Sequence, residues 1–393
     1  MKEKILTNVR IIDPSQKMDE IGAIIVNEKG KIQSIGNKVK ISDASKSADR
    51  IDLKGNIAIP GIVDMKAFVG EPGFEYKENF RTLSQAALSG GVTSIVTMPN
   101  TKPIIDNVSM VDFIIRRGRD KAKVNLFPCA SITRQIEGNQ MTEFGLLKAR
   151  GIIGFSDVNK TIQNTDLMSR IMNYASDIDV LIMQHVEDYE LSKNSCINEG
   201  EIATRLGLQG VSYIAEKIII ERDLSLLNEF PCRYHINQIS SKNSLNVLKK
   251  NKSNGLKFST GVSINNLSLN QNDIGEFRTF LKLSPPLRGE EDRLSLIEGI
   301  KNGLIDVIVS DHIPEDEESK RLPFAQAATG AIGVETLLPL ALELYHNESL
   351  PLDKIIECLT INPSNILKIK KGTLKKGSDA DICIIDLNKP WVV

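Results

Sequence analysis

Short apolar runs recur along the whole chain, but the segments that separate them change in character. Near both ends, at about 1–56 and 372–386, the runs are separated by Gly, Asp and other polar residues, with a turn signal at 27–30, which is typical of β-structure. Between about 58 and 366, runs of strand length alternate with helical segments, as in parallel β/α units. The pattern therefore predicts a (β/α)₈ barrel flanked by β segments from both chain ends.

Apolar runs in the central part are predicted to be barrel strands. They span residues 62–65, 92–101, 123–129, 151–157, 180–185, 233–238 and 306–312. A helix is predicted over Asn107–Arg117, with Gly118 as its stop signal, and Ser240 with Ser241 marks the start of another helix. Polar residues close several of the strands, and the carboxyl ends of barrel strands are where barrel enzymes place their chemistry.

Composition and charge exclude several classes of partner. The chain of 393 residues is 41% hydrophobic and 25% charged, which is ordinary for a globular protein. Its net charge of −1 gives no long-range field toward nucleic acid or an anionic membrane, so neither is expected as a partner. No apolar run reaches about 18 residues and no signal peptide is evident, which predicts a cytoplasmic protein without a membrane span.

Histidine and cysteine are too sparse for a conventional zinc site. The only histidines are His185, His235, His312 and His346, whereas a two-metal hydrolase typically uses about four histidines on its metals alone. The five cysteines include no C-x-x-C pair, so neither a thiolate zinc site nor a disulfide framework is expected. We interpret His235 and His346 as structural or exposed residues.

The stretch from residue 57 to residue 80 closely resembles the first metal-binding strand of the dihydroorotases, which are cyclic amidohydrolases of the amidohydrolase superfamily. In that family the strand reads Pro-Gly-x-x-Asp-x-His-x-His-x-Arg-Glu-Pro-Gly. Asp64 is kept here, whereas Lys66 and Phe68 stand at the two histidine positions and Gly70 stands at the position of a substrate-binding arginine. The residues that shape the backbone of the motif are kept, whereas two metal ligands and the substrate-binding arginine are replaced.

Further motifs of this family follow in order, so the resemblance covers essentially the full chain. Asn100 lies in an intact Met-Pro-Asn-Thr motif whose asparagine contacts substrate in dihydroorotases. Asp311 and His312 lie in an intact catalytic-aspartate motif. The resemblance thus implies that Asn100 and His312 are remnants of substrate binding and that Asp311 is the remnant of the family's catalytic base, idle without a metal-activated water.

The resemblance also implies a metal-ligand set, which is only half kept. The remnant ligand positions are Asp157, His185 and Asp311, and the replaced positions are Lys66, Phe68 and Gln238. Glutamine is a poor neutral donor for zinc, phenylalanine is no donor, and an ammonium group repels a metal cation. Although active members of the family use zinc, we expect no intact metal site and no cofactor in this chain.

The surviving carboxylates raise a question of charge balance. Asp64 and Asp311 are both expected to point into the barrel mouth, where a buried carboxylate without a counter-charge is costly. We therefore hypothesise that Lys66 replaces the metal electrostatically by pairing with Asp311 or with Asp157.

The domain organisation and the function follow from the same resemblance. In the family the two chain ends combine, which here implies a small β-sandwich from 1–56 with 367–393 beside a barrel at 57–366. The leading hypothesis is a catalytically silent dihydroorotase-like chain of pyrimidine biosynthesis. Such chains accompany some bacterial aspartate transcarbamoylases, so we expect an oligomeric assembly with the transcarbamoylase catalytic chain.

Two other functions are consistent with the sequence. One is an active dihydroorotase or related cyclic amidohydrolase that converts dihydroorotate to N-carbamoyl-aspartate with a reduced, single-metal site. The other is a sensor that binds a dihydroorotate-like molecule through Asn100 and His312 without turning it over. The loss of the arginine at Gly70 argues against the sensor, because a carboxylate ligand would lose its bidentate partner.

Overall fold

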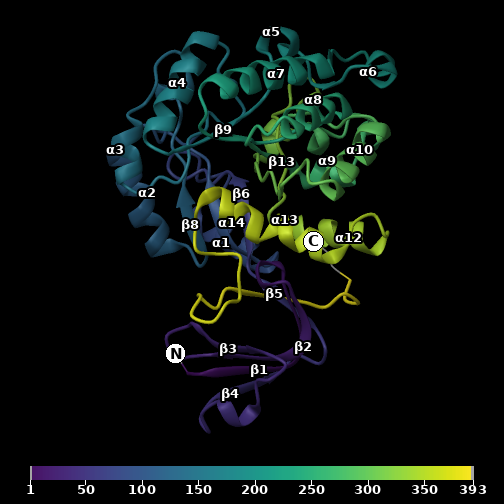
Figure 1. Ribbon diagram of the computed structural model, residues 1–393. Coiled ribbons are helices and arrows are strands. Elements are labelled where there is room, and N and C mark those ends of the chain that lie inside the picture. The colour runs from purple at the N-terminus through teal and green to yellow at the C-terminus, as the bar shows by residue number, and fades with distance from the viewer. Residues whose placement is uncertain (1, 391–393) are drawn as a thin grey trace.

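The computed structural model describes residues 2–390 and contains two units, a sheet and a barrel (Figure 1). In the described part of the chain the sheet has the order β15-β5-β1-β2-β3, with β4 paired to β1. Its strands are β1 (Lys4–Asp13), β2 (Met18–Val26), β3 (Ile32–Gly36), β4 (Asp49–Asp52), β5 (Ile57–Pro60) and β15 (Ile382–Ile385). Both chain ends therefore meet in one continuous sheet, which includes β5 and so extends slightly beyond the predicted limit at residue 56.

Strand β5 joins the sheet to the barrel because its alternate side chains pack into two different cores. Successive side chains of a strand point to opposite faces. Ile57 and Ile59 belong to the main apolar core shared with the barrel, whereas Ala58 between them belongs to the sheet's own core. The turn signal at 27–30 is confirmed as the hairpin between β2 and β3, where the Asn27 amide donates to the Lys31 carbonyl at 2.9 Å.

The barrel is a ring of parallel strands closed on itself. Its strands, in spatial order, are β6 (Ile62–Ala67), β7 (Val92–Thr97), β8 (Asn125–Pro128), β9 (Leu181–Gln184), β12 (Arg233–Ile236), β13 (Ser259–Ser263) and β14 (Val307–Val309). Phe155 fills the place between β8 and β9 through bridges to Ala130 and Ile182. A bridge between Ala67 and His312 then closes β14 onto β6. The predicted (β/α)₈ architecture is confirmed.

The predicted strand at 151–157 is reduced to one bridging residue, Phe155. Gly151 and Gly154 flank Ile152 and Ile153, and glycine weakens a strand because it adds backbone entropy and no side chain to pack. Beyond Phe155 the chain leaves the ring, since Asp157 is held by the loop that follows β8.

The helices surround the ring of strands (Figure 1). The longer ones are α1 (Phe80–Ser89), α2 (Val108–Lys121), α4 (Thr165–Asp177), α7 (Tyr213–Glu229), α8 (Lys242–Ser253), α10 (Glu290–Lys301), α12 (Leu337–His346), α13 (Leu352–Leu359) and α14 (Ile361–Leu367). The shorter ones are α3 (Phe144–Ala149), α5 (Tyr189–Ser192), α6 (Glu201–Leu206), α9 (Ile264–Ser268) and α11 (Glu317–Lys320), and two short strands, β10 (Ile197–Asn198) and β11 (Gly210–Val211), pair with each other. No helix within residues 2–390 is long and apolar enough to cross a membrane.

The ends of two helices test the sequence signals. Helix α2 begins after Asn107, whose side chain accepts a hydrogen bond from the Met110 amide, but it continues through Gly118 to Lys121. The predicted stop at Gly118 is wrong: this glycine is buried against β8, where a Cβ would lie 3.0 Å from Leu126 Cδ1. Ser241 does cap α8, as predicted, by accepting from the Ser244 amide.

Shortening Ile59 to alanine tests the junction between the two units. Ile59 is fully buried in the shared core, so Ile59→Ala is expected to lower the free energy of unfolding by about 2–5 kcal/mol through lost burial and a residual cavity. Ile51→Ala is the matched control, because Ile51 lies on the edge strand β4 and is 39% exposed. Urea denaturation measures both. Equal losses in the two variants would contradict this account of the core.

Candidate functional site

A lysine side chain occupies the centre of the barrel mouth. Lys66, on β6, is 3% exposed, and its Nζ lies 2.9 Å from Oδ1 of Asp311, which follows β14. The approach is oblique, so this contact is an ion pair rather than a well-directed hydrogen bond. Nζ donates hydrogen bonds to Oε1 of Gln238 at 2.6 Å and to Oδ1 of Asn159 at 2.9 Å. Of the two partners proposed for Lys66, the structure selects Asp311.

Asp157, the other proposed partner, is held by the loop after β8. Its carboxylate accepts hydrogen bonds from the backbone amides of Ile132 at 2.8 Å and Thr133 at 3.0 Å, and from the Thr133 hydroxyl. Burial raises the pKa of Asp157 to about 6, although these hydrogen bonds oppose the shift. Asp157 therefore stabilises a loop and does not pair with the Lys66 ammonium.

The remaining ligand positions hold an imidazole without polar partners and an aromatic ring. His185 is 2% exposed, and neither ring nitrogen has a hydrogen-bond partner in the described part of the chain. Burial, and secondarily the charge of Lys66, lowers the pKa of His185 to about 3, so the ring is neutral at physiological pH. Phe68 is buried, with its ring centroid 6.2 Å from that of Phe74.

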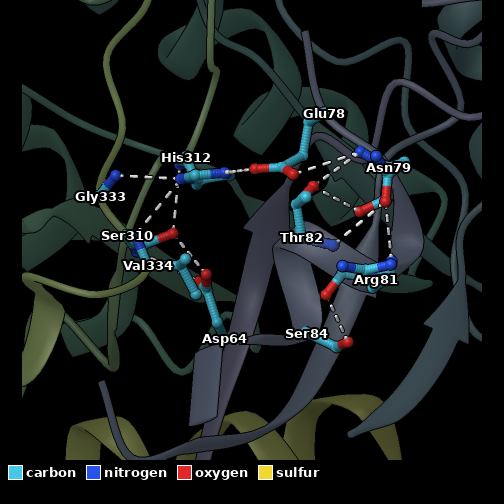
Figure 2. A network of polar contacts seen from close by, with 10 residues as sticks. All are labelled: Asp64, Glu78, Asn79, Arg81, Thr82, Ser84, Ser310, His312, Gly333 and Val334. Carbon is cyan, nitrogen blue, oxygen red and sulfur yellow. Dashed lines mark hydrogen bonds and ion pairs between the residues drawn. The ribbon is translucent and has the colours of Figure 1, made fainter. Parts of the chain in front are cut away.

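Asp64 belongs to a separate polar network that connects β14 to the loop before α1 (Figure 2). Its carboxylate accepts from the Ser310 amide at 3.1 Å and from the Ser310 hydroxyl. The same hydroxyl oxygen accepts from the His312 amide at 3.1 Å, and Nε2 of His312 lies 3.2 Å from Oε2 of Glu78. Burial raises the pKa of Asp64, and the hydrogen bonds from Ser310 oppose the shift.

His312 has no ring nitrogen left for a ligand. Its Nδ1 accepts from the Gly333 amide at 3.1 Å and from the Val334 amide at 3.4 Å, which fixes the proton on Nε2, where it is donated to Glu78. Asn100 differs from His312, because it is partly exposed and its Oδ1 has no partner within residues 2–390. Of the two remnants predicted to bind substrate, only Asn100 offers a free polar atom.

Apolar side chains fill the rest of the mouth. The side chains inside the ring form one cluster that includes Met65 and Met183, and Ile136 and Val158 extend this cluster toward the loops. Val158 stands where the family has a second carboxylate, and it is 5% exposed with a φ of +60°, a conformation that β-branched residues rarely adopt. A cavity of about 860 Å³ lies elsewhere, between α12 and β15, and the residues at the barrel mouth do not line it.

The donor set of the mouth does not fit a zinc ion. Zinc requires at least three well-placed N, S or O ligands, and no group of three or more His, Cys, Asp or Glu side chains in residues 2–390 could hold a metal ion. At the remnant positions, Asp311 is paired with an ammonium, Asp157 is committed to the Thr133 loop, and His185 stands alone.

Two contributors to the site were not predicted. Asn159 occupies the family's glycine position and supplies a carbonyl oxygen to Lys66. A polar residue at a position where the family has glycine, in a site whose metal ligands are replaced, is a signal that could have indicated this contact with Lys66. Glu78 carries no such signal, since its contact with His312 depends on the path of the loop that precedes α1.

A closed parallel barrel with polar residues at the carboxyl ends of β6, β9, β12 and β14 defines the (β/α)₈ class of fold. Among solved structures, L-hydantoinase (dihydropyrimidinase) from Arthrobacter aurescens superposes with a TM-score of 0.85 over 97% of this chain and 86% of its own, at 23% sequence identity. This likeness confirms the fold.

Sequence comparison identifies the family. Residues 55–244 match the family described as dihydro-orotase-like. The dihydroorotase of Ehrlichia canis (strain Jake) is 41% identical over 389 residues, which are 98% of this chain and 86% of the relative. The dihydroorotase of Syntrophus aciditrophicus (strain SB) is 39% identical over 99% of this chain and 91% of the relative. The chain belongs to the dihydroorotase family.

Removing the buried ammonium tests the charge balance of the mouth. Lys66→Met leaves Asp311 buried without a counter-charge, so the free energy of unfolding is expected to fall by about 3–5 kcal/mol. Lys66→Met combined with Asp311→Asn removes both charges and is expected to recover part of this loss. Lys217→Met serves as the control, because Lys217 forms an exposed pair with Glu221. An unchanged melting temperature for Lys66→Met would refute the role of Lys66.

Acid lability follows from two buried histidines. Burial lowers the pKa of both His185 and His235 to about 3, below the unfolded value of about 6.5. The unfolded chain therefore binds more protons than the folded chain between these two pH values. The contribution of each histidine to the free energy of unfolding is fully present above about pH 6.5 and falls by up to about 1.4 kcal/mol per pH unit as the pH drops. Between about pH 4 and 6, Asp157 instead raises the free energy of unfolding as the pH drops, because its pKa in the folded chain lies above its unfolded value.

Urea denaturation at about pH 7 and pH 5 measures this slope. His235→Gln, which removes one of the two groups, is expected to reduce the slope by about one proton's contribution. The same slope in the variant and in the original chain would show that His235 titrates normally in the folded state.

Proposed function

We propose that this chain is a catalytically silent dihydroorotase-like protein of pyrimidine biosynthesis. The observation that carries the proposal is the buried Lys66 ammonium, which is paired with Asp311 and hydrogen-bonded to Gln238. These positions correspond to ligands and to the catalytic base in active members of the family. The chain keeps the scaffold of a dihydroorotase and uses its polar residues to stabilise that scaffold.

The chemistry of ring opening explains why the pairing of Lys66 with Asp311 argues against hydrolysis. Hydrolysis of an unactivated cyclic amide at neutral pH requires a hydroxide made from a bound water and a Lewis acid on the carbonyl, and both are supplied by metal ions. The Asp311 carboxylate instead faces the Lys66 ammonium at 2.9 Å, where a general base would have to contact the attacking water. Asp311 is therefore assigned a structural role.

The substrate side of the mouth supports the same conclusion. Gly70 stands at the family's arginine position with a φ of +70°, and a Cβ there would lie 2.4 Å from the Glu78 carbonyl oxygen and 2.7 Å from that of Phe74. The loop from Gly70 to Glu78 thus follows a path that excludes any side chain at this position. A carboxylate substrate has lost the planar, bidentate partner that arginine provides.

By family analogy we propose that the scaffold serves as an assembly partner of the aspartate transcarbamoylase catalytic chain. The residues that shape the backbone, such as Pro60 with Gly61 and Pro72 with Gly73, are kept, whereas half of the ligand positions and the substrate-binding arginine are replaced. The barrel is closed and its core is continuous. Loss concentrated at ligand and substrate-contact positions, with the fold retained, is what a structural role predicts.

One observation favours a second function. The relatives that are 39–41% identical to this chain are named dihydroorotases. An active dihydroorotase with a reduced metal site is therefore the alternative, and it requires Lys66 to withdraw from Asp311 to admit a cation.

Metal content and turnover separate these two functions. We expect less than about 0.1 zinc per chain after purification without chelator, and no hydrolysis of dihydroorotate above background. The Ehrlichia canis dihydroorotase, prepared in parallel, is the positive control for both measurements. One zinc per chain together with turnover would establish the alternative.

The partner is tested separately by affinity purification from the native host. A tagged chain is expected to retain the aspartate transcarbamoylase catalytic chain at a fixed stoichiometry through gel filtration. Elution of the tagged chain free of transcarbamoylase would remove the assembly role and leave the conclusion on catalysis unaffected.

A further inference from the structure

Residues 323–330, called the strap below, connect α11 to the segment that contacts His312. The strap is neither helix nor strand, and its Phe324 packs into a small apolar cluster that is separate from the barrel core. Just beyond the strap, the amides of Gly333 and Val334 donate to Nδ1 of His312 (Figure 2). The conformation of the strap therefore affects one edge of the barrel mouth.

Two buried lysines hold the strap by its backbone carbonyls. Nζ of Lys282 donates to the carbonyl of Ala325 at 2.9 Å and to that of Ala327 at 2.7 Å. Nζ of Lys320 donates to the carbonyl of Ala328 at 2.8 Å and to one carbonyl outside the strap at 3.1 Å. Lys282 is 8% exposed and Lys320 is 6% exposed. Both ammonium groups therefore lie between the strap and the loops that it covers.

These two ammonium groups have hydrogen-bond acceptors but no counter-charge. Neither forms an ion pair in the part of the chain that the structure describes, and Glu315, whose charge acts on Lys320, pairs with Lys77 at 2.5 Å. The titratable group that acts on Lys282 is the buried Cys196, and burial raises the pKa of its thiol although Lys282 opposes the shift. A buried ammonium without a counter-charge costs free energy.

Burial makes the protonation of the two lysines depend on whether the strap is closed. Burial, reinforced by the charge of Lys282 and opposed by that of Glu315, lowers the pKa of Lys320 to about 8. Burial lowers the pKa of Lys282 as well. On α11 itself, the two glutamates pair with Arg321. An amine in water has a pKa of about 10.4, so an open strap binds more protons than a closed one above about pH 8. Lower pH therefore favours the open form.

We propose that the strap is a proton-sensitive gate at the edge of the barrel mouth. Hydrogen bonds from Lys282 and Lys320 to its carbonyls hold it closed, and their uncompensated charge favours its opening. Gly330 is the pivot, because its φ is +141° and a Cβ there would lie 2.6 Å from the Ile313 carbonyl oxygen. Opening is a local event, since the strap includes no residue of a barrel strand.

Gating by the strap does not depend on whether the barrel mouth hydrolyses anything. Lys66 and Asp311 lie outside the strap, so substitutions of Lys282 or Lys320 leave that ion pair in place. Opening of the strap can therefore be measured without reference to activity, zinc or a transcarbamoylase.

Hydrogen–deuterium exchange on the full chain at about pH 7 and about pH 9 tests the proposal. The Ala328 and Gly330 amides are the reporters, because they donate to the carbonyls of Ser319 at 3.1 Å and Lys282 at 3.0 Å. Once the chemical exchange rate at each pH is corrected for, their protection is expected to rise about 10-fold from pH 7 to pH 9. The amides of β12, in the barrel, are expected to show no such rise.

Lys320→Arg separates the charge of this residue from its titration. A guanidinium stays protonated at pH 9, so the strap amides of this variant are expected to lose most of the 10-fold rise. Lys252→Arg is the matched control. Lys252 also donates to a carbonyl, that of Gly303 at 3.1 Å, but it pairs with the Asp306 carboxylate, so its replacement is expected to leave the rise unchanged.

Equal corrected protection of the strap amides at the two pH values in the unmodified chain would overturn the proposal. This comparison requires no variant, so it is decisive even if a substitution prevents folding. A full 10-fold rise in a folded Lys320→Arg chain would also overturn the proposal, because the proton would then belong to another group. Circular dichroism with thermal melting checks that each variant is folded.

Discussion

The barrel mouth depends on how each of its buried carboxylates is neutralised or hydrogen-bonded. Removing a carboxylate from water costs several kcal/mol unless donors or a counter-charge replace the lost hydration. Asp64 receives its donors from Ser310, Asp157 from the loop at Thr133, and Asp311 faces the Lys66 ammonium. In a metal hydrolase a cation bound from solution takes part in this balance. Here the chain supplies the positive charge itself.

Most polar groups around Lys66 and His312 have partners within the protein, whereas the ring nitrogens of His185 and Oδ1 of Asn100 have none in residues 2–390. Catalytic sites hold donors and acceptors whose capacity is used by substrate or by the transition state. In this chain the ring nitrogens of His312 contact Glu78 and two backbone amides of the following loop, and Lys66 already has three partners. These contacts connect β6, β12 and β14 to one another and to the loop before α1. These contacts therefore contribute to the rigidity of the closed ring.

Apolar side chains at the barrel mouth and on the outer helices differ in how far they are covered. The mouth is filled by Phe68, Val158 and the surrounding apolar cluster. The outer side of α7, in contrast, leaves Ile214 and Ile218 uncovered. The mouth is thus filled with apolar side chains, and some of the uncovered apolar side chains lie on an outer helix.

The sequence by itself determined the architecture and showed which residues stand at the motif positions. Alternating apolar runs predicted the barrel because each strand must bury its side chains whatever the loops do, and Lys66, Phe68 and Gln238 were identified because motif positions are read in order along the chain. Only the tertiary structure decided that Lys66 pairs with Asp311 rather than Asp157, since both follow strand ends and the choice depends on loops far apart in sequence. It also decided that Gly118 lies within a helix, where Leu126 packs against it, and that the outer side of α7 is uncovered. Periodicity shows which positions share a face, whereas what covers that face depends on contacts between distant segments.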